Sequence, residues 1–559
     1  MKKFWVAGLI IWVAFLIICV ALVTRFYQLG NLPGGLTWDE AAIAYNGFSI
    51  LETHRDEWLN LMPVSFKSFG DYKAPLAIYL NSIFTYYFGL DPWAIRLPFA
   101  LAGVLSVIGM MLLAELVWRL SLENKTKTKT KTVFFSSRTV GLIAGGVIAL
   151  SPWHVLFSRV GFESGLALTE LIWGVYFFFL WLKSQSSKPV GSMPTDLSLI
   201  WLVLTIGLLA STFYTYHSAK VAIPLMIGLL FYWSIKNKHL NFKHGLSFGL
   251  PFLGLLWLFF KDAFFGEGLT RAGVTIVAEY GLSLKLLTTF LINVWAHLSP
   301  EFLVLGQTDS LRHSTGVWGV LLPTTYVFWL IGLGATIKNI WLIVKQKTQI
   351  IKLPLIGYLG LGWTVFGLLP AMIGVEVPHP NRALLALPGF ILLSLVGWEA
   401  LFNWLKQRLP KLINNVIIIL VVLHLLLAGL FMKTYLTTYQ SASSEEFLAG
   451  YLEVAQVAWQ YLDGTDQRLP VNQVIMTSQY GQPYIFVLLA GQINPMAYHN
   501  GALISFLFPD EATVADLSRK NALVIAKPGT FGLEPSRATQ IIYDDYGNDR
   551  FWLYVTEEE

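Results

Sequence analysis

Long apolar stretches recur along this chain from Phe4 to Met432, separated by short polar segments. A helix that crosses a lipid bilayer needs about 20 predominantly apolar residues, and these stretches reach that length. Charged residues make up 13% of the 559 residues and hydrophobic residues 55%, whereas about 25% of the residues in an average soluble protein are charged. The sequence therefore predicts a polytopic, mostly α-helical membrane protein and excludes an ordinary soluble globule.

Hydropathy predicts about eleven transmembrane helices. The predicted spans are 4–24, 95–118, 139–157, 167–183, 198–213, 220–235, 245–260, 317–337, 353–374, 384–403 and 412–432. The first span has a basic start, but its apolar stretch of about 20 residues exceeds the roughly 7 to 15 of a cleavable signal peptide. We expect it to be retained. The only cysteine, Cys19, lies in this span, which excludes an intramolecular disulfide.

The basic residues orient these helices. If Lys2 and Lys3 are cytoplasmic, so are the segments WRLSLENKTKTKTKTVFFSSR, KSQSSK, KNKHLNFKH, KNIWLIVKQKTQIIK and WLKQRLPK, which are all rich in Lys or Arg. This arrangement satisfies the positive-inside rule, and the opposite one would place nearly all these cations outside. We therefore predict a plasma-membrane protein with a cytoplasmic N-terminus. Because the excess positive charge lies in these loops, no nucleic-acid partner is expected.

Two segments do not follow the pattern of spanning helices. The run APLAIYLNSIFTYYFGL, 74–90, would reverse every later loop if it crossed the membrane, so we expect an interfacial helix within a first outer segment, 25–94. After a transmembrane domain at 1–432, the tail changes character. EEFLAGYLEVAQVAWQYLDG predicts an amphipathic helix, and NQVIMTSQY, ALVIAKPG and TQIIYDDYGNDRFWLYV predict strands. We expect a small extracytoplasmic α/β domain at 433–559.

Two adjacent carboxylates, Asp39 and Glu40, stand in the stretch GGLTWDEAAIAYNGFSI of the first outer segment. Carboxylates near a helix start can cap its free N–H groups and interact favourably with its dipole. A short helix beginning near Ala41 would explain both residues in this way. The alternative is a catalytic or binding role, and for Glu40 also a metal ligand.

Further polar residues gather on the same predicted side of the membrane. They are Tyr72, Lys73, Arg159, Glu163, Tyr216, His217, Lys220, Arg312, His313, His379 and Arg382. Each has a structural interpretation: the cations can snorkel to the interface, the histidines can be hydrogen-bonded, and Arg159 and Glu163 can form an ion pair one turn apart. Their shared side favours a site for a lipid phosphate, which requires carboxylates and cations together.

The order of these residues resembles a known superfamily. The acidic pair in the first outer loop, then YKAPLAIYLNSIFTYYFGLDPWAIRLPFALAG and PWHVLFSRVGFESG, are similar to membrane glycosyltransferases of the C-type fold. The nearest group is that of the protein O-mannosyltransferases and lipid A aminoarabinose transferases. The resemblance covers the first third of the chain, with further similar pieces at GQTDSLRHSTGVWGVLLP and PNRALLALPGF.

The resemblance implies an enzyme that transfers a sugar from a polyprenyl phosphate to an acceptor hydroxyl, usually with inversion. Asp39 corresponds to the candidate base and Glu163 to the second outer acidic residue, where relatives often have Asp. Lys73 keeps the cation of a frequent KPP motif, which reads Lys-Ala-Pro here. An inverting transfer needs a base for the acceptor proton, and cations stabilise the leaving phosphate.

The remaining candidates take supporting roles in this interpretation. Candidates for the donor phosphate are Lys73, Lys220, Arg312 and Arg382, with Lys220 and Arg382 preferred. Supporting residues are Glu40, Tyr72, Arg159, Tyr216, His217, His313 and His379. A divalent metal stays open, because no regular ligand spacing of a zinc motif occurs. The sequence identifies neither the sugar nor the acceptor.

Other function classes remain open. A transporter or flippase of lipid-linked glycans would show charges near the middle of several helices, or an internal repeat, and neither is evident. An enzyme of the same fold that transfers an oligosaccharide en bloc, or a surface-polysaccharide ligase, would need a wider outer groove. A non-catalytic assembly partner would tolerate the loss of both Asp39 and Glu163.

Overall fold

The structure is a computed structural model, and it describes residues 2–123, 134–186, 196–237, 239–240, 242–266, 270–307, 310–346, 355–465, 468 and 470–556. The Thr-Lys tract at 125–132, which the sequence predicts to be a cytoplasmic loop, lies outside these residues.

Apolar helices long enough to cross a membrane dominate the structure. The described residues contain nine such stretches. They are formed mainly by α1 (Lys2–Phe26), α4 (Pro92–Glu123), α7 (Glu163–Ser186), α8 (Asp196–Ser211), α9 (Ala219–Lys236), α14 (Pro323–Gln346), α15 (Leu355–Met372), α17 (Leu387–Arg408) and α18 (Ile413–Leu436). Helices α10 (Phe242–Leu255) and α11 (Trp257–Phe265), which are bent by 51°, make a tenth stretch if the pair counts as one span. The predicted polytopic helical fold is confirmed.

The count is lower than the predicted eleven because the span expected at 139–157 is broken. It forms α5 (Ser137–Ala149) and α6 (Pro152–Phe157). The 13 residues of α5 extend only about 20 Å at 1.5 Å per residue, short of a hydrocarbon core of about 30 Å. Pro152 begins α6, a position that needs no backbone N–H.

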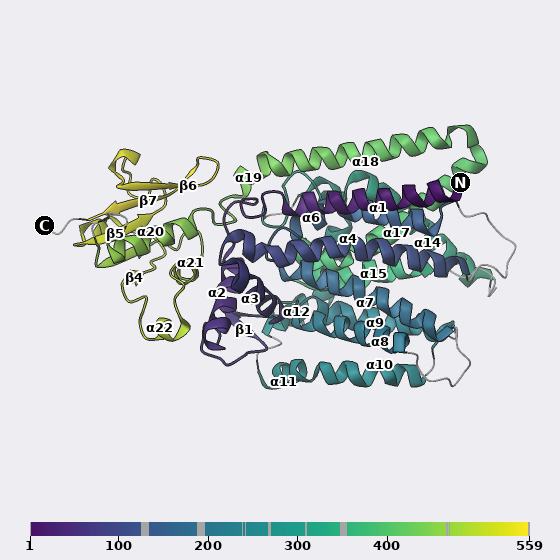
Figure 1. The fold of residues 1–559 in the computed structure, drawn as a ribbon, viewed down its shortest axis with the longest axis horizontal. Coiled ribbons are helices and arrows are strands. Elements are labelled where there is room, and N and C mark those ends of the chain that lie inside the picture. The colour runs from purple at the N-terminus through teal and green to yellow at the C-terminus, as the bar shows by residue number, and fades with distance from the viewer. Residues whose placement is uncertain are drawn as a thin grey trace.

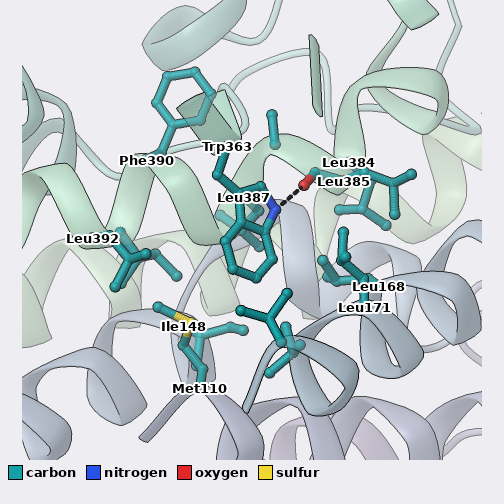
Figure 2. Packing of buried hydrophobic residues seen from close by; sticks show 14 of the residues in the cluster. Met110, Ile148, Leu168, Leu171, Trp363, Leu384, Leu385, Leu387, Phe390 and Leu392 are labelled. Carbon is teal, nitrogen blue, oxygen red and sulfur yellow. Dashed lines mark hydrogen bonds between the residues drawn. The ribbon is translucent and has the colours of Figure 1, made fainter. Parts of the chain in front are cut away.

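The spanning helices run side by side as a bundle, shown in Figure 1. Its interior is a large apolar cluster that includes Trp363, whose indole N–H donates to the Leu385 carbonyl at 2.9 Å (Figure 2). Helices α14 and α17 approach closely at Gly332 and Gly397, where an added Cβ would come within 2.0 Å of the opposing main chain. Small residues permit such close contacts between membrane helices.

Shorter elements gather at one end of the bundle, away from the N-terminus (Figure 1). They include α2 (Trp38–Thr53), β1 (Phe66–Ser68), β2 (Asp71–Lys73), α3 (Leu76–Phe88), α12 (Ile276–Tyr280), α13 (Leu284–Leu298) and α16 (Pro380–Ala383). The 3-10 turn η1 (Thr212–Tyr214) precedes α9. Helix α3 has 13 residues and occupies most of the stretch 74–90, for which the sequence predicts an interfacial helix.

The C-terminal region folds around a five-stranded sheet with the strand order β4-β3-β5-β7-β6. Its strands are β3 (Gln473–Met476), β4 (Phe506–Leu507), β5 (Ala522–Ala526), β6 (Gln540–Tyr543) and β7 (Asp549–Val555). Strands β4, β3 and β5 are parallel, and β7 pairs antiparallel with both β5 and β6. Helices α19 (Thr438–Ser443), α20 (Tyr451–Asp463), α21 (Pro483–Ala490) and α22 (Pro495–His499) complete it.

The C-terminal region shares a hydrophobic core with the first outer segment. Ala41, Ala42 and Tyr45 of α2 belong to the same buried cluster as residues of α20, α21 and the sheet. The Tyr45 hydroxyl donates to the Ile493 carbonyl at 2.9 Å. The C-terminal region therefore packs directly on the helix that carries Asp39.

Candidate functional site

Asp39 lies in the first turn of α2. Thr37 caps this helix, and its hydroxyl accepts a hydrogen bond from the Glu40 N–H. The Asp39 carboxylate is in contact with the Lys73 ammonium from β2. Asp39 is 32% exposed and Lys73 only 8%, so the carboxylate is accessible while its partner is enclosed. A carboxylate is also favoured at this position by the dipole of α2.

Glu40 is enclosed and joins three segments. It forms an ion pair with Arg96 of α4 at 2.8 Å, and its Oε1 accepts from the Gly161 N–H at 3.0 Å. Both Glu40 and Arg96 are fully buried. An added Cβ on Gly161 would come within 2.9 Å of the Glu40 side chain, so glycine is required for this contact. Of the alternatives for Glu40, the geometry supports the helix cap, here extended into an ion pair.

Glu163 is the first residue of α7 and is partly exposed. The bond between Gly161 and Glu40 brings the start of α7 beside the start of α2. Asp39 and Glu163 therefore stand within two residues of the same contact, although 124 positions separate them in the sequence. The structure places both acidic residues that the sequence singles out at the same end of the bundle.

The turn between η1 and α9 contacts β2. His217 Nε2 lies 2.8 Å from the Tyr72 carbonyl oxygen, and the Lys220 ammonium lies 3.2 Å from His217 Nδ1. Because a carbonyl only accepts, Nε2 carries the proton and Nδ1 accepts from Lys220. Lys220 also lies over the Phe259 ring, 5.0 Å from its centroid. This turn thus supports the strand that carries Lys73.

Arg312 lies near enough to Asp39 to interact with its charge. Its guanidinium lies over the Trp38 ring, 4.0 Å from the centroid, and its backbone N–H donates to Glu446. Burial lowers the pKa of Arg312, while the charges of Asp39 and Glu446 oppose this shift. The Arg312 Nε is buried and has no hydrogen-bond partner among the residues that the structure describes. Such an unsatisfied donor is a place where an anion can bind.

His313 and His379 lie next to each other, with ring centroids 4.9 Å apart. His313 also stacks in parallel on Phe157 at 6.0 Å. Burial, reinforced by the Arg312 charge, lowers the pKa of His313 to about 4. Burial, reinforced by His313 and Arg382, lowers the pKa of His379 to about 2. Both imidazoles are neutral at neutral pH, so they add hydrogen-bonding groups and no charge.

Arg382 lies in α16, which His379 caps through Nδ1. Its guanidinium forms an ion pair at 2.9 Å with Glu376, which is itself largely exposed. One Arg382 nitrogen lies 2.8 Å from where a Cβ on Gly374 would stand. The two preferred phosphate ligands therefore lie in different groups: Lys220 belongs to the turn that contacts β2, and Arg382 belongs to the helix that His379 caps.

Two supporting candidates lie in the interior. Arg159 is 1% exposed, and its guanidinium donates to the carbonyls of Thr24, Tyr27 and Leu32 and to the Tyr435 hydroxyl. All three of its nitrogens are used to hold the end of α1 against α18, which is a structural role rather than contact with a substrate. Tyr216 is likewise buried, in the core of the bundle.

An apolar groove of about 600 Å³ opens beside the Arg382 end of the site. Residues of α12 and α13 and Ile373 line it. Thr275, which caps α12, pairs with Gly374, the neighbour of both Ile373 and the Arg382 guanidinium. An ionic cluster around Arg382 and an apolar groove thus adjoin.

No group of three or more His, Cys, Asp or Glu side chains in the described ranges is arranged to hold a metal ion.

Sequence reasoning missed two buried ionisable residues. Arg96 forms the ion pair with Glu40, and Glu170 of α7 is buried in a membrane-spanning helix. The sequence did contain a signal for both residues. An ionisable residue inside an apolar span costs free energy and therefore has a specific partner. Trp38, which stacks on Arg312, carried no such signal.

Comparisons with known proteins identify the fold. No family model matches the sequence, and no curated protein matches it. The structure is similar to ArnT from Cupriavidus metallidurans bound to undecaprenyl phosphate, with a TM-score of 0.50, 15% identity and 97% of each chain covered. It is also similar to the oligosaccharyltransferase AglB from Archaeoglobus fulgidus in complex with an inhibitory peptide and a dolichol-phosphate, with a TM-score of 0.50, 15% identity and coverage of 88% of this chain and 64% of that one. The chain thus has the C-type fold of membrane glycosyltransferases.

Proposed function

We propose that this protein is an inverting glycosyltransferase that moves a sugar from a polyprenyl phosphate to an acceptor hydroxyl, with Asp39 as the base. The observation that carries the proposal is the position of Asp39, a partly exposed carboxylate that Lys73 contacts and Arg312 approaches, in this fold. The positive-inside pattern supports a site on the extracytoplasmic face of the plasma membrane.

Asp39 is suited to remove the acceptor proton. A neighbouring ammonium favours the ionised form of a carboxylate, and Lys73 occupies that place. The exposed part of Asp39 leaves room for an acceptor hydroxyl to approach. Glu163, which starts the neighbouring helix, would orient the acceptor or stabilise positive charge on the sugar ring.

The donor phosphate would bind between Arg312 and Arg382. Arg312 supplies a buried Nε without a partner, and Arg382 has only the exposed Glu376 as an ion-pair partner among the described residues. Arg side chains bind phosphate oxygens through planar, often bidentate contacts. The neutral His313 and His379 lie between the two cations and would hydrogen-bond the phosphate. Charge growing on the leaving phosphate would then meet fixed cations.

The groove of α12 and α13 would accommodate the first isoprene units of the donor. Its apolar lining adjoins the Arg382 end of the proposed phosphate site. ArnT and AglB were each solved with a polyprenyl phosphate, which supports a lipid-phosphate donor for a chain of this fold.

The proposal is tested by incubating the purified full chain with a panel of polyprenyl-phosphate sugars and measuring released polyprenyl phosphate. Asp39→Asn should lower the rate by roughly 10²- to 10⁴-fold, the usual contribution of a general base. Glu52→Gln, an exposed carboxylate on the same helix, is the matched control and should leave the rate unchanged. Wild-type rates in Asp39→Asn would reject the assigned base, and ion-driven transport without transfer would reject the enzyme.

En bloc transfer of an oligosaccharide is the second candidate. It is favoured by the similarity to the oligosaccharyltransferase AglB, whose TM-score equals that of ArnT. Donors carrying one sugar and donors carrying an oligosaccharide, offered at equal concentration, separate the two. A monosaccharide transferase should turn over the first far faster than the second.

A further inference from the structure

Glu170 is a buried carboxylic acid inside a membrane-spanning helix. It lies in the second turn of α7, seven residues after Glu163 and therefore on the same helix face. Its side chain is 6% exposed, and no ion pair joins it to another described residue. An isolated charge is very costly in apolar surroundings, so such a group is held neutral.

The hydrogen bonds of Glu170 agree with the neutral form. Thr215 Oγ1 lies 3.0 and 2.8 Å from the two carboxyl oxygens and 3.0 Å from the Ser211 carbonyl oxygen. The threonine hydroxyl has one hydrogen for these three acceptors. If Glu170 is protonated, it donates to Thr215, and Thr215 donates to Ser211. Every hydrogen then has an acceptor.

Thr215 belongs to the turn that leads to the site. This turn runs from η1 into α9, and Thr215 is fully buried in it. Two residues later, His217 contacts the carbonyl of Tyr72, and Tyr72 immediately precedes Lys73 in β2. Lys73 in turn contacts Asp39. A continuous series of bonded residues therefore links Glu170 to the proposed base.

We infer that Glu170, as a neutral carboxylic acid, is a positioning residue that fixes the turn of Thr215 to Lys220 so that His217 holds β2 and its Lys73 against Asp39. It touches no reacting atom in this role. The inference deepens the proposed function and rests on it for the part that concerns catalysis.

If Glu170 acts as a neutral hydrogen-bond donor, some substitutions should preserve its role and others should abolish it. Glutamine at 170 keeps a donor, because its NH₂ group can donate to Thr215 as the carboxylic acid does. Leucine fills a similar volume and offers no donor. Thr215→Val removes the middle of the series, and Thr205→Val is its matched control, because Thr205 is equally buried but its hydroxyl bonds only within α8, to the Trp201 carbonyl.

The test measures sugar transfer across pH for the full-length variants in lipid nanodiscs. Glu170→Gln should stay within about threefold of wild type, whereas Glu170→Leu and Thr215→Val should lose roughly tenfold or more in kcat, because a small displacement of a catalytic contact is costly. The acidic limb of the pH–rate profile of Glu170→Leu and Thr215→Val should move to higher pH, because Lys73 is held less firmly against Asp39. The double variant Glu170→Leu with Thr215→Val should be no worse than the poorer single variant, since both break one series of contacts.

A second readout does not depend on activity. Amide hydrogen exchange of segments 66–73 and 212–220 should accelerate in Glu170→Leu and stay at the wild-type rate in Glu170→Gln and Thr205→Val. Unchanged exchange and an unchanged pH profile in Glu170→Leu would overturn the inference. A Glu170→Gln variant as impaired as Glu170→Leu would also overturn the inference, because it would show that the carboxyl group of Glu170 has to ionise. A wild-type protein that releases no polyprenyl phosphate would reject the proposed function, while the exchange rates would still decide the role of Glu170 in the fold.

Discussion

Lys73 contacts Asp39 across 34 positions of the sequence, and the two residues come from different elements, β2 and the first turn of α2. The lysine is enclosed and the aspartate partly exposed. The structure thus gives Lys73 a partner that the sequence did not predict for it, since it was a candidate for the donor phosphate. The Lys73 ammonium can contact both the Asp39 carboxylate and the donor phosphate if the donor and the acceptor meet at Asp39.

Replacing Lys73 by Met should therefore change how the rate depends on pH. Without the ammonium, the Asp39 carboxylate loses a partner that favours ionisation, and the acidic limb of kcat/KM should move to higher pH. We expect a loss of roughly tenfold or more at neutral pH, typical of removing a charge beside a reacting group. The measurement is kcat/KM between pH 5 and 9 in steps of about half a unit.

Lys67→Met is the matched control for this variant. Lys67 lies in β1 of the same hairpin and is exposed, with its ammonium over the Trp58 ring. It should keep the wild-type profile. A Lys73→Met profile that overlays that of wild type would show that the contact with Asp39 has no part in the reaction.

The ion pair of Glu40 with Arg96 should affect the free energy of unfolding rather than the rate of the reaction. Glu40→Ala leaves the Arg96 guanidinium charged and buried, and breaking one partner of a buried pair typically costs about 3–5 kcal/mol. The double variant Glu40→Ala with Arg96→Leu should recover part of that loss. Thermal unfolding in detergent measures both. Equal melting temperatures for wild type and Glu40→Ala would contradict the structural role of this pair.

The sequence was sufficient to predict the helices, because each apolar run must satisfy its backbone hydrogen bonds internally and so forms a helix. One apolar run did not form the single spanning helix predicted for it. The run 139–157 has the length of a span, but Pro152 breaks it into α5 and α6. The strands β3, β5, β6 and β7 also fall within the stretches for which the sequence predicts strands.

The partners within the site could not be read from the sequence. Lys73, Arg312 and Arg382 look alike as cations near an interface, yet the structure pairs Lys73 with Asp39, stacks Arg312 on Trp38 and pairs Arg382 with Glu376. The contacts of Lys73 and Arg312 join segments far apart in the chain, so they depend on how the helices pack. Local periodicity carries no information about such packing.

Glu57 should make stability depend on pH in the neutral range. It is fully buried where the first outer segment meets Tyr484 of α21, and Tyr484 and Asn46 offset only part of the cost of burying its charge. Burial raises the pKa of Glu57 from 4.5 to about 7. A raised pKa means that the folded state prefers the protonated form. The stabilisation is therefore fully present below pH 4.5 and is lost as pH rises through about 7.

The size of this effect should be on the order of 3 kcal/mol, at about 1.4 kcal/mol for each unit of pKa. The groups that face Glu57 are Asp56, Lys67, Tyr45, Tyr484 and Tyr498. None of these five changes charge between pH 5 and 8 at its ordinary pKa, so the difference in melting temperature between Glu57→Gln and wild type across that range reports on Glu57. Glu57→Gln should flatten the loss of stability above pH 6. A Glu57→Gln protein that still loses stability from pH 6 to 8 would assign the effect to another group.

His313 and His379 should make stability depend on pH in the direction opposite to that of Glu57. Burial lowers the pKa of His313 from 6.5 to about 4 and that of His379 to about 2. The folded state therefore prefers the neutral rings, and their contribution to stability is present above pH 6.5 and is lost as pH falls through about 4. His379→Asn retains hydrogen-bonding groups without a titrating ring, so it should reduce the fall in melting temperature between pH 6.5 and 4. His499→Asn is the control, because His499 belongs to α22, where its ring bonds the Glu57 carbonyl, and lies away from the pair. If both variants lose stability in acid as steeply as wild type, the acid sensitivity does not arise at His379.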